Sequence, residues 1–203
     1  MPNWCFSSVK IHDSEEKIDR IWSELEIALS SNPYKADFGN SWLGNLLSHI
    51  GIDPMDTDVR CRGSIAYEVK ETNCITLDTE SAWGPHIQCI EMFVKQYSDT
   101  ATIEYVAEEC GCELYWSNSD EIVGAYNVDV FDASLLPDKF KWLEEWVGIV
   151  NERDLNEKLA SSLGTTGDTE FLINKADDYC SDEAGEVLFS INQYIYVPIG
   201  EDT

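Results

Sequence analysis

The chain has 203 residues, with 39 acidic and 13 basic side chains and a formal net charge of -26 at pH 7. A field this negative repels nucleic acid and anionic membranes and speeds encounter with basic surfaces, so direct nucleic-acid binding is excluded and a positively charged partner is favoured. Hydrophobic residues make up 43% of the chain and aromatic residues 11%, which excludes an acidic disordered tail and allows a buried core.

The sequence also limits compartment and domain count. No apolar run approaches the roughly 20 residues of a membrane span, and the first residues lack the pattern of a signal peptide, so we expect a cytoplasmic protein. The seven cysteines stand at irregular spacing, several of them among apolar residues, and we interpret them as reduced thiols. The length allows one domain, or one domain with an appendage.

The first part of the chain predicts a strand followed by two helices. Residues 4–11 alternate apolar and polar side chains, which is typical of a strand. Behind an approximate capping box at Asp13, apolar residues at helical spacing predict a helix that ends near Asn32. A shorter helix is predicted over residues 41–50, with Ser41 as its cap.

A hairpin, a third helix and a meander of strands follow. Alternating residues predict the hairpin strands at 65–69 and 75–77. Pro85 suits the first turn of a helix, and the apolar residues that recur behind it extend this helix to Tyr97. The remaining strands of this part are predicted at 102–108, 113–116 and 122–130.

This order of elements contains β-α-β-β-α-β, the split arrangement of the ferredoxin-like fold. It predicts the α+β class, with an antiparallel sheet and helices on one face. Beyond Ala133, apolar stripes over residues 140–150 and 155–163 predict helices, residues 171–179 suit a further helix, and residues 188–197 suit a strand. We therefore expect a ferredoxin-like domain over residues 1–131 and a mainly helical addition, which can end in a strand, over residues 132–203. We expect this addition to pack on the same body as the first domain.

Two short strings resemble the YubB-like family of phage and plasmid proteins. One is the opening Met1-Pro2-Asn3-Trp4-Cys5, and the other is the strand and turn at 103–112, in which Cys110 stands before the glycine of the family's Ala-Glu-Glu-Gly type turn. The resemblance covers residues 1–130 in the order of elements. It implies a ferredoxin-like fold and an origin in a phage or other mobile element, hence a bacterial host cell, and it transfers no catalytic residue.

Motifs for catalysis and metal binding are absent from the sequence. The three histidines stand in no ligand arrangement, and Cys110 and Cys112 lack the second cysteine pair of a structural zinc site. The acidic stretches at 53–58 and 177–186 depart from the calcium-loop motif, and residues 164–167 lack the ending of a phosphate loop. The sequence therefore predicts no catalytic residue, no metal ligand, no cofactor and no enzyme activity.

Four tryptophans are candidates for binding anchors, because indole brings a large apolar area and one hydrogen-bond donor to an interface. Core packing is the commoner use of the residue. For Trp142 and Trp146, four residues apart on a predicted helix, we favour the core. The other two are Trp83 and Trp116.

We interpret the acidity as mimicry of nucleic acid, with carboxylates in place of phosphates. Glu104 and Glu108 share one face of a predicted strand, roughly 13 Å apart at 3.3 Å per residue, and Lys or Arg placed to meet phosphates also meets carboxylates. The predicted partner is a basic host nuclease or effector complex, and the chain would be an inhibitor of the anti-CRISPR or anti-restriction type. The predicted partner-binding residues are Glu104, Glu108, Glu109, Glu113, Asp120, Glu121, Asp177, Asp178, Asp182, Glu183 and Glu186.

The alternative is a small-molecule-binding protein or small enzyme with a pocket between the sheet and the C-terminal helices. The distribution of charge separates the two hypotheses. A continuous carboxylate face supports mimicry, whereas an apolar concavity that holds one carboxylate of shifted pKa supports an enzyme.

Overall fold

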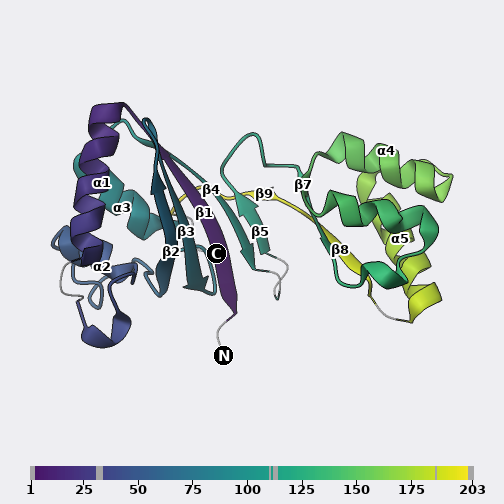
Figure 1. The fold of residues 1–203 in the computed structure, drawn as a ribbon, viewed down its shortest axis with the longest axis horizontal. Helices are drawn as coiled ribbons and strands as arrows, with labels where there is room; N and C mark the ends of the chain where they lie inside the picture. Colours follow the sequence, from purple (N-terminus) through teal and green to yellow (C-terminus); the bar gives the residue numbers. More distant parts are fainter. Residues whose placement is uncertain (1–2, 31–33, 110, 112–113, 186, 201–203) are drawn as a thin grey trace. The chain divides into compact units, whose positions relative to one another are not determined.

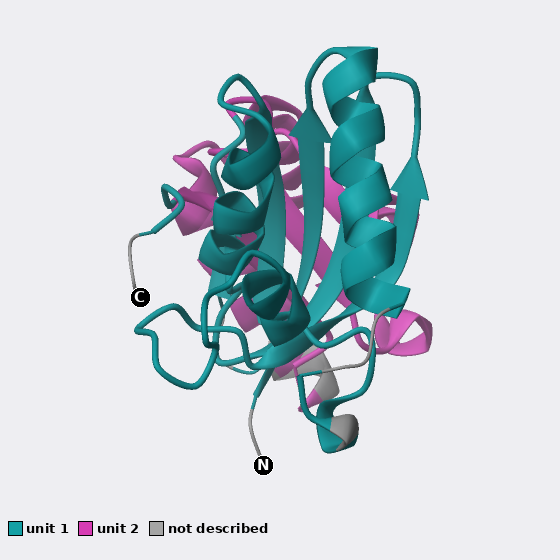
Figure 2. Cartoon of the chain, turned by 90° about the vertical axis from the view of Figure 1, so that its left-hand side faces the viewer, with its two compact units in different colours: residues 1–119, 197–203 teal, residues 120–196 magenta. Residues whose placement is uncertain are grey.

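The computed structural model describes residues 3–30, 34–109, 111, 114–185 and 187–200, without the side chains of 36 and 182–184. The chain divides into two compact units (Figure 2). Unit 1 runs to Ser119 and includes the segment from Val197, and unit 2 comprises Asp120–Tyr196. The boundary lies before the strand at 126–130, whereas the sequence predicts it after that strand.

The larger sheet of the described chain has six strands in the order β2-β3-β1-β4-β5-β9 (Figure 1). Strand β1 pairs antiparallel with both β3 and β4, and the outer pairs β2–β3 and β4–β5 are antiparallel as well. The fold is thus of the α+β class. The strands are β1 (Trp4–His12), β2 (Gly63–Lys70), β3 (Cys74–Ala82), β4 (Thr102–Glu109), β5 (Leu114–Ser117) and β9 (Ile195–Tyr196).

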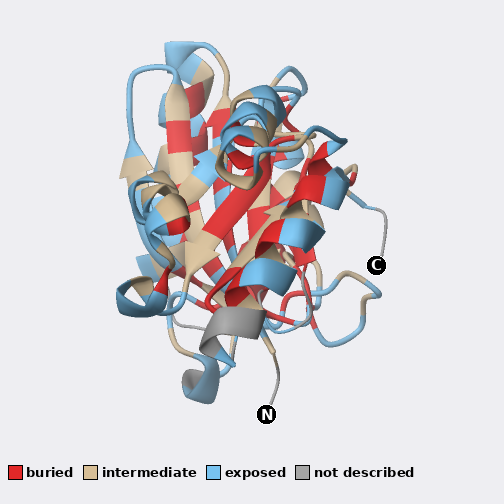
Figure 3. Cartoon of the chain, turned by 90° about the vertical axis from the view of Figure 1, so that its right-hand side faces the viewer, coloured by how far each residue is buried: buried red, intermediate tan, exposed pale blue. Residues whose placement is uncertain are grey.

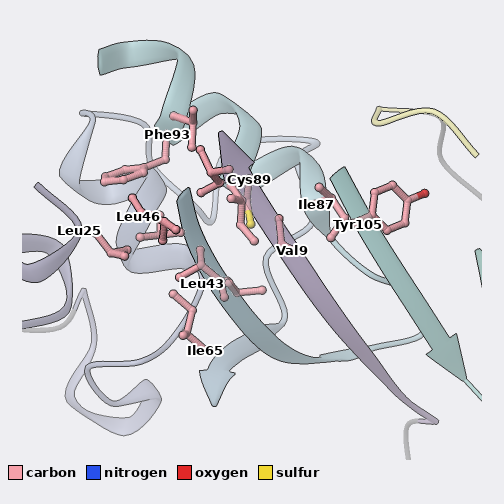
Figure 4. Packing of buried hydrophobic residues seen from close by; sticks show 14 of the residues in the cluster. Val9, Leu25, Leu43, Leu46, Ile65, Ile87, Cys89, Phe93 and Tyr105 are labelled. Atoms are coloured by element: carbon pink, nitrogen blue, oxygen red, sulfur yellow. The ribbon is translucent and has the colours of Figure 1, made fainter. Parts of the chain in front are cut away.

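Three helices of unit 1 pack on one face of this sheet: α1 (Glu15–Ser30), α2 (Gly44–His49) and α3 (Ile87–Tyr97) (Figure 2). Strand β1 alternates between buried and more exposed residues along its length, because successive side chains point to opposite faces. Its buried residues join apolar side chains from all three helices in one core (Figure 4). Core members drawn there include Val9, Leu25, Leu46, Ile87 and Phe93.

Two helix boundaries in unit 1 differ from the sequence prediction. Residue Ser41 does not cap α2, because residues 41–43 pair with β2: Ile65 donates its N–H to the carbonyl of Ser41, and Leu43 donates to Gly63. Helix α3 begins at Ile87 instead of Pro85, since His86 has a φ of 48° and leaves the helical region. The predicted end of α1 near Asn32 lies outside the described residues.

Unit 2 has its own sheet and its own core. The strands β6 (Tyr126–Val130), β7 (Gly148–Val150) and β8 (Phe189–Gln193) pair in the order β7-β6-β8. Helices α4 (Glu152–Leu163) and α5 (Thr169–Ala184) show buried and exposed positions around each helix (Figure 3). The predicted strand at 122–130 was therefore wrongly assigned to the first sheet, because β6 pairs with β7 and β8 in a second one. The predicted addition is also less helical than expected, since it contributes β7 as well as β8 to that sheet.

The apolar stripe at residues 140–150 is also not an α-helix. Asp138–Trp146 forms consecutive 3-10 turns, and β7 begins at Gly148, whose φ of 104° lies in the left-handed region. Trp142 is half-buried and packs against the unit 2 core, and the half-buried Trp146 has its ring centroid 5.1 Å from that of Trp142.

Burial of two cysteines predicts slow reaction with a thiol reagent. Burial raises the pKa of Cys5 to about 11, while the hydrogen bond with Ser7 lowers it and the charge of Glu109 raises it further; burial also raises the pKa of Cys89. Because the thiolate is the nucleophile, about one Cys5 thiol in a thousand is reactive near pH 8. Among the described cysteines, peptide mapping after brief labelling should find Cys74, which is partly exposed, modified before Cys5 and Cys89; equal labelling of Cys5 in the folded chain would contradict this.

No helix among the described residues has the length and apolar character needed to cross a bilayer.

Candidate functional site

The face of the larger sheet opposite α1, α2 and α3 carries aromatic and acidic side chains together. We call it the open face. The exposed fraction of Phe6 is 55% and that of Trp4 is 47%, so neither aromatic ring is covered by the core. The open face is defined by Trp4, Phe6, Ser8, Lys10, Tyr67, Asp78, Glu80, Glu104, Val106 and Glu108.

The strand register places these residues in rows across the sheet. Phe6 lies opposite Glu80 on β3 and opposite Glu108 on β4, so a carboxylate stands on each side of the phenyl ring. Neighbouring strands are about 4.8 Å apart, which puts the backbones of the two glutamates about 10 Å from each other. In the next row, Ser8 lies between Asp78 and Val106.

A depression of about 260 Å³ lies on this face, and Ser8 is one of its lining residues. Phe6 and Val106 give it apolar walls, and Asp78, Glu80 and Glu108 add carboxylates to its lining. A lysine or arginine side chain suits such a surface, because its methylene stem covers apolar groups while its charged head meets the carboxylates. The depression is therefore suited to single basic side chains.

The charges of the open face decide which class of ligand it accepts. Aromatic rings on an exposed sheet face are also used to stack nucleic-acid bases, but those surfaces are basic. Here Asp78, Glu80, Glu104 and Glu108 outnumber Lys10, so the phosphates of a nucleic acid would be repelled. A guanidinium or ammonium group is attracted both by the rings and by the carboxylates.

The structure places two of the predicted binding residues on the open face and removes a third. Glu104 and Glu108 point outward, and Glu104 accepts a hydrogen bond from the Ser119 hydroxyl at 3.1 Å. Glu109 is 4% exposed and accepts the N–H of Gly111 at 3.1 Å. It follows Glu108 in an alternating strand and so faces the helices; its predicted role at a surface was wrong.

The other predicted carboxylates lie elsewhere. Asp120, Glu121 and Asp178 are exposed residues of unit 2, and Asp177 on α5 is half-buried. Glu113, Asp182, Glu183 and Glu186 fall outside the described side chains. Unit 1 thus brings together Glu104 and Glu108 of the predicted set.

Sequence reasoning missed the open-face residues on β1 and β3. Trp4 and Phe6 occupy the outward positions of a strand that was predicted, so the alternation itself was the signal that could have identified them. Asp78 and Glu80 lie beyond the predicted end of β3 at residue 77, although they continue its alternation.

Metal binding has no structural counterpart among the described side chains, where no group of three or more His, Cys, Asp or Glu residues is placed to hold an ion. Comparison of the chain with protein-family models, with curated proteins and with solved structures finds no match. The residues of the open face themselves must therefore carry the functional argument.

Proposed function

We propose that the chain is a binding protein for a basic partner, and that the open face of unit 1 holds lysine or arginine side chains of that partner. The observation that carries the proposal is the row in which Glu80 and Glu108 flank the half-exposed ring of Phe6. Asp78 and Glu80 form no ion pair within the described part of the chain, so their charge is available to a partner.

The partner class that we propose is a nucleic-acid-binding protein of a bacterial defence system, a nuclease or an effector complex. The chain would inhibit it in the manner of an anti-CRISPR or anti-restriction protein, within the host cytoplasm. Carboxylates about 10 Å apart across the sheet and about 13 Å apart along β4 can meet basic groups that otherwise hold phosphates. The net charge of -26 would speed the encounter, and the aromatic rings would supply specificity.

A ferredoxin-like fold for unit 1 belongs to the same proposal. Its support is the strand order β2-β3-β1-β4, with α1 between β1 and β2 and α3 between β3 and β4. Because that fold hosts many unrelated functions, the functional proposal depends on the open face instead of on the fold.

The open face is tested by neutralising its central carboxylates. The double variant Glu80→Gln, Glu108→Gln is expected to weaken binding of a fluorescent arginine-rich peptide at least tenfold, because a hydrogen bond to a charged group contributes about 1.5–3 kcal/mol. The readout is fluorescence anisotropy at several salt concentrations. The matched control, Glu144→Gln with Glu145→Gln at two exposed residues of the 3-10 segment of unit 2, removes the same charge and is expected to change affinity less than about twofold. Equal losses in both variants would mean that net charge alone binds the peptide.

The partner class needs a separate measurement. The chain, used as bait in bacterial lysate and eluted by a salt gradient, is expected to retain a nucleic-acid-binding protein that competing DNA displaces. The Glu80→Gln, Glu108→Gln bait should lose that protein, while the Glu144→Gln, Glu145→Gln control should keep it. Retention by all three baits, or failure of DNA to compete, would contradict the proposed mimicry.

A further inference from the structure

The loop between β3 and α3 borders a depression of about 420 Å³ on unit 1. Its lining residues are Arg60, Cys61, Arg62, Ala82, Trp83 and His86. A narrower recess of about 50 Å³ adjoins it and shares Arg60 and His86. None of the described residues that line either hollow is acidic, although 39 of the 203 residues of the chain are Asp or Glu. We name the larger hollow the Trp83 depression.

Two of the four arginines of the chain, Arg60 and Arg62, line the Trp83 depression. Arg60 and Arg62 are both exposed. A guanidinium group presents several N–H donors in one plane, which suits the oxygens of a phosphate or carboxylate. The depression is therefore matched to an anion in a protein that otherwise repels anions.

The backbone here is held in an uncommon conformation that turns an indole outward. Trp83 has a φ of 74° and His86 a φ of 48°, both in the left-handed region that bulky residues rarely enter. Trp83 donates its N–H to the carbonyl of Asn3 at 3.0 Å, and the Ser81 hydroxyl donates to the carbonyl of Gly84 at 2.6 Å. The exposed fraction of Trp83 is 54%. Strain that the surroundings enforce in this way is often found at ligand sites.

We propose that the Trp83 depression binds a nucleoside monophosphate, with the base stacked on the Trp83 indole and the phosphate held by Arg60 and Arg62. Its volume lies within the usual range for small-molecule sites, about 300–1,000 Å³. Two arginines match the charge of one phosphate group. The net charge of the chain excludes a nucleic-acid polymer but acts much less on a ligand that carries a single phosphate. This proposal does not depend on the open face.

The test is isothermal titration calorimetry of the whole chain with AMP. We expect AMP to bind, and adenosine or inorganic phosphate alone to bind at least tenfold more weakly, because each lacks one of the two contacts. Arg62→Gln keeps the backbone carbonyl that accepts the N–H of Ala82, and Trp83→Gly removes an exposed side chain from a position that favours glycine. Each variant is expected to weaken AMP binding about tenfold.

The matched control is Arg153→Gln on α4, whose arginine pairs with Asp154 and lies in unit 2. Its affinity for AMP should equal that of the unaltered chain. Absence of AMP binding at millimolar concentration would overturn the proposal. Equal affinities for AMP and inorganic phosphate would also overturn it, because they would mean that the depression binds the anion and that the base does not stack on Trp83. The variant Glu80→Gln, Glu108→Gln should bind AMP normally, so this result is separable from that of the open-face test.

Discussion

The substitution Gly63→Ala is expected to destabilise unit 1 by about 3 kcal/mol, because there is no space for a side chain at the start of β2. The added Cβ would lie 2.5 Å from the carbonyl oxygen of Glu80 and 2.7 Å from the Cβ of Ser81. The residue cannot move away, since its N–H donates to Cys61 and its carbonyl accepts from Leu43. The clash therefore has to separate β2 from β3.

Hydrogen exchange and urea unfolding measure the effect. Gly63→Ala should lower the protection of the amides of β2 and β3 and shift the unfolding midpoint to lower urea. The matched control is Gly84→Ala, where the added Cβ would meet no atom within 4 Å; its stability should stay within about 0.5 kcal/mol of the unaltered chain. Similar midpoints for the two variants would show that β2 can shift without cost.

Most strands and helices of unit 1 could be predicted, because the residue patterns that indicate them involve only neighbouring positions in the sequence. The alternation of β1 and the helical spacing of the buried residues Ile18, Ile21 and Leu25 in α1 each need only neighbouring residues. The start of α2 could not be predicted in this way, because Ser41 is drawn into pairing with β2 by residues that are distant in the sequence. Pairing with β2 therefore prevails over the local preference of a serine for the N-cap position of a helix.

The candidate site could be predicted only in part for a similar reason. Glu104 and Glu108 were found because strand periodicity places them on one face, but the same periodicity turns Glu109 toward the helices. The neighbours of β4 are set by the order of strands in the sheet, which periodicity within one strand does not reveal. Glu80 and Phe6 therefore become neighbours of Glu108 only once β1 lies between β3 and β4.

The charge of the chain is not evenly distributed, and that unevenness is what makes two separate binding surfaces reasonable. The open face places carboxylates beside aromatic rings, which favours a cation. The Trp83 depression places Arg60 and Arg62 beside an indole with no acidic residue among its described lining, which favours an anion. If the net charge of -26 served solubility alone, acidic residues would be expected at both surfaces. Solubility alone would not account for a depression with two arginines and no acidic residue in its described lining.

Truncation of Phe140 to alanine is expected to destabilise unit 2 by about 3–5 kcal/mol, the usual cost of emptying a buried phenylalanine site. Phe140 is 0% exposed and lies in the 3-10 segment, where it packs with Leu143 and with Leu155 of α4. A 3-10 segment has weaker hydrogen bonds than an α-helix, so it depends on its packed side chains for its position. Loss of the ring should therefore also release Asp138–Trp146.

Hydrogen exchange of α4, α5 and the 3-10 segment tests this, with Phe171→Ala on α5 as the matched control. Phe171 is 42% exposed, so removal of the same ring there should cost less than about 1 kcal/mol. Protection in unit 2 should fall for Phe140→Ala and stay for Phe171→Ala. If both variants keep their protection, the 3-10 segment is held by its backbone and by Trp142, whose indole N–H donates to the Ser162 hydroxyl at 2.9 Å, and Phe140 is not the residue that anchors it.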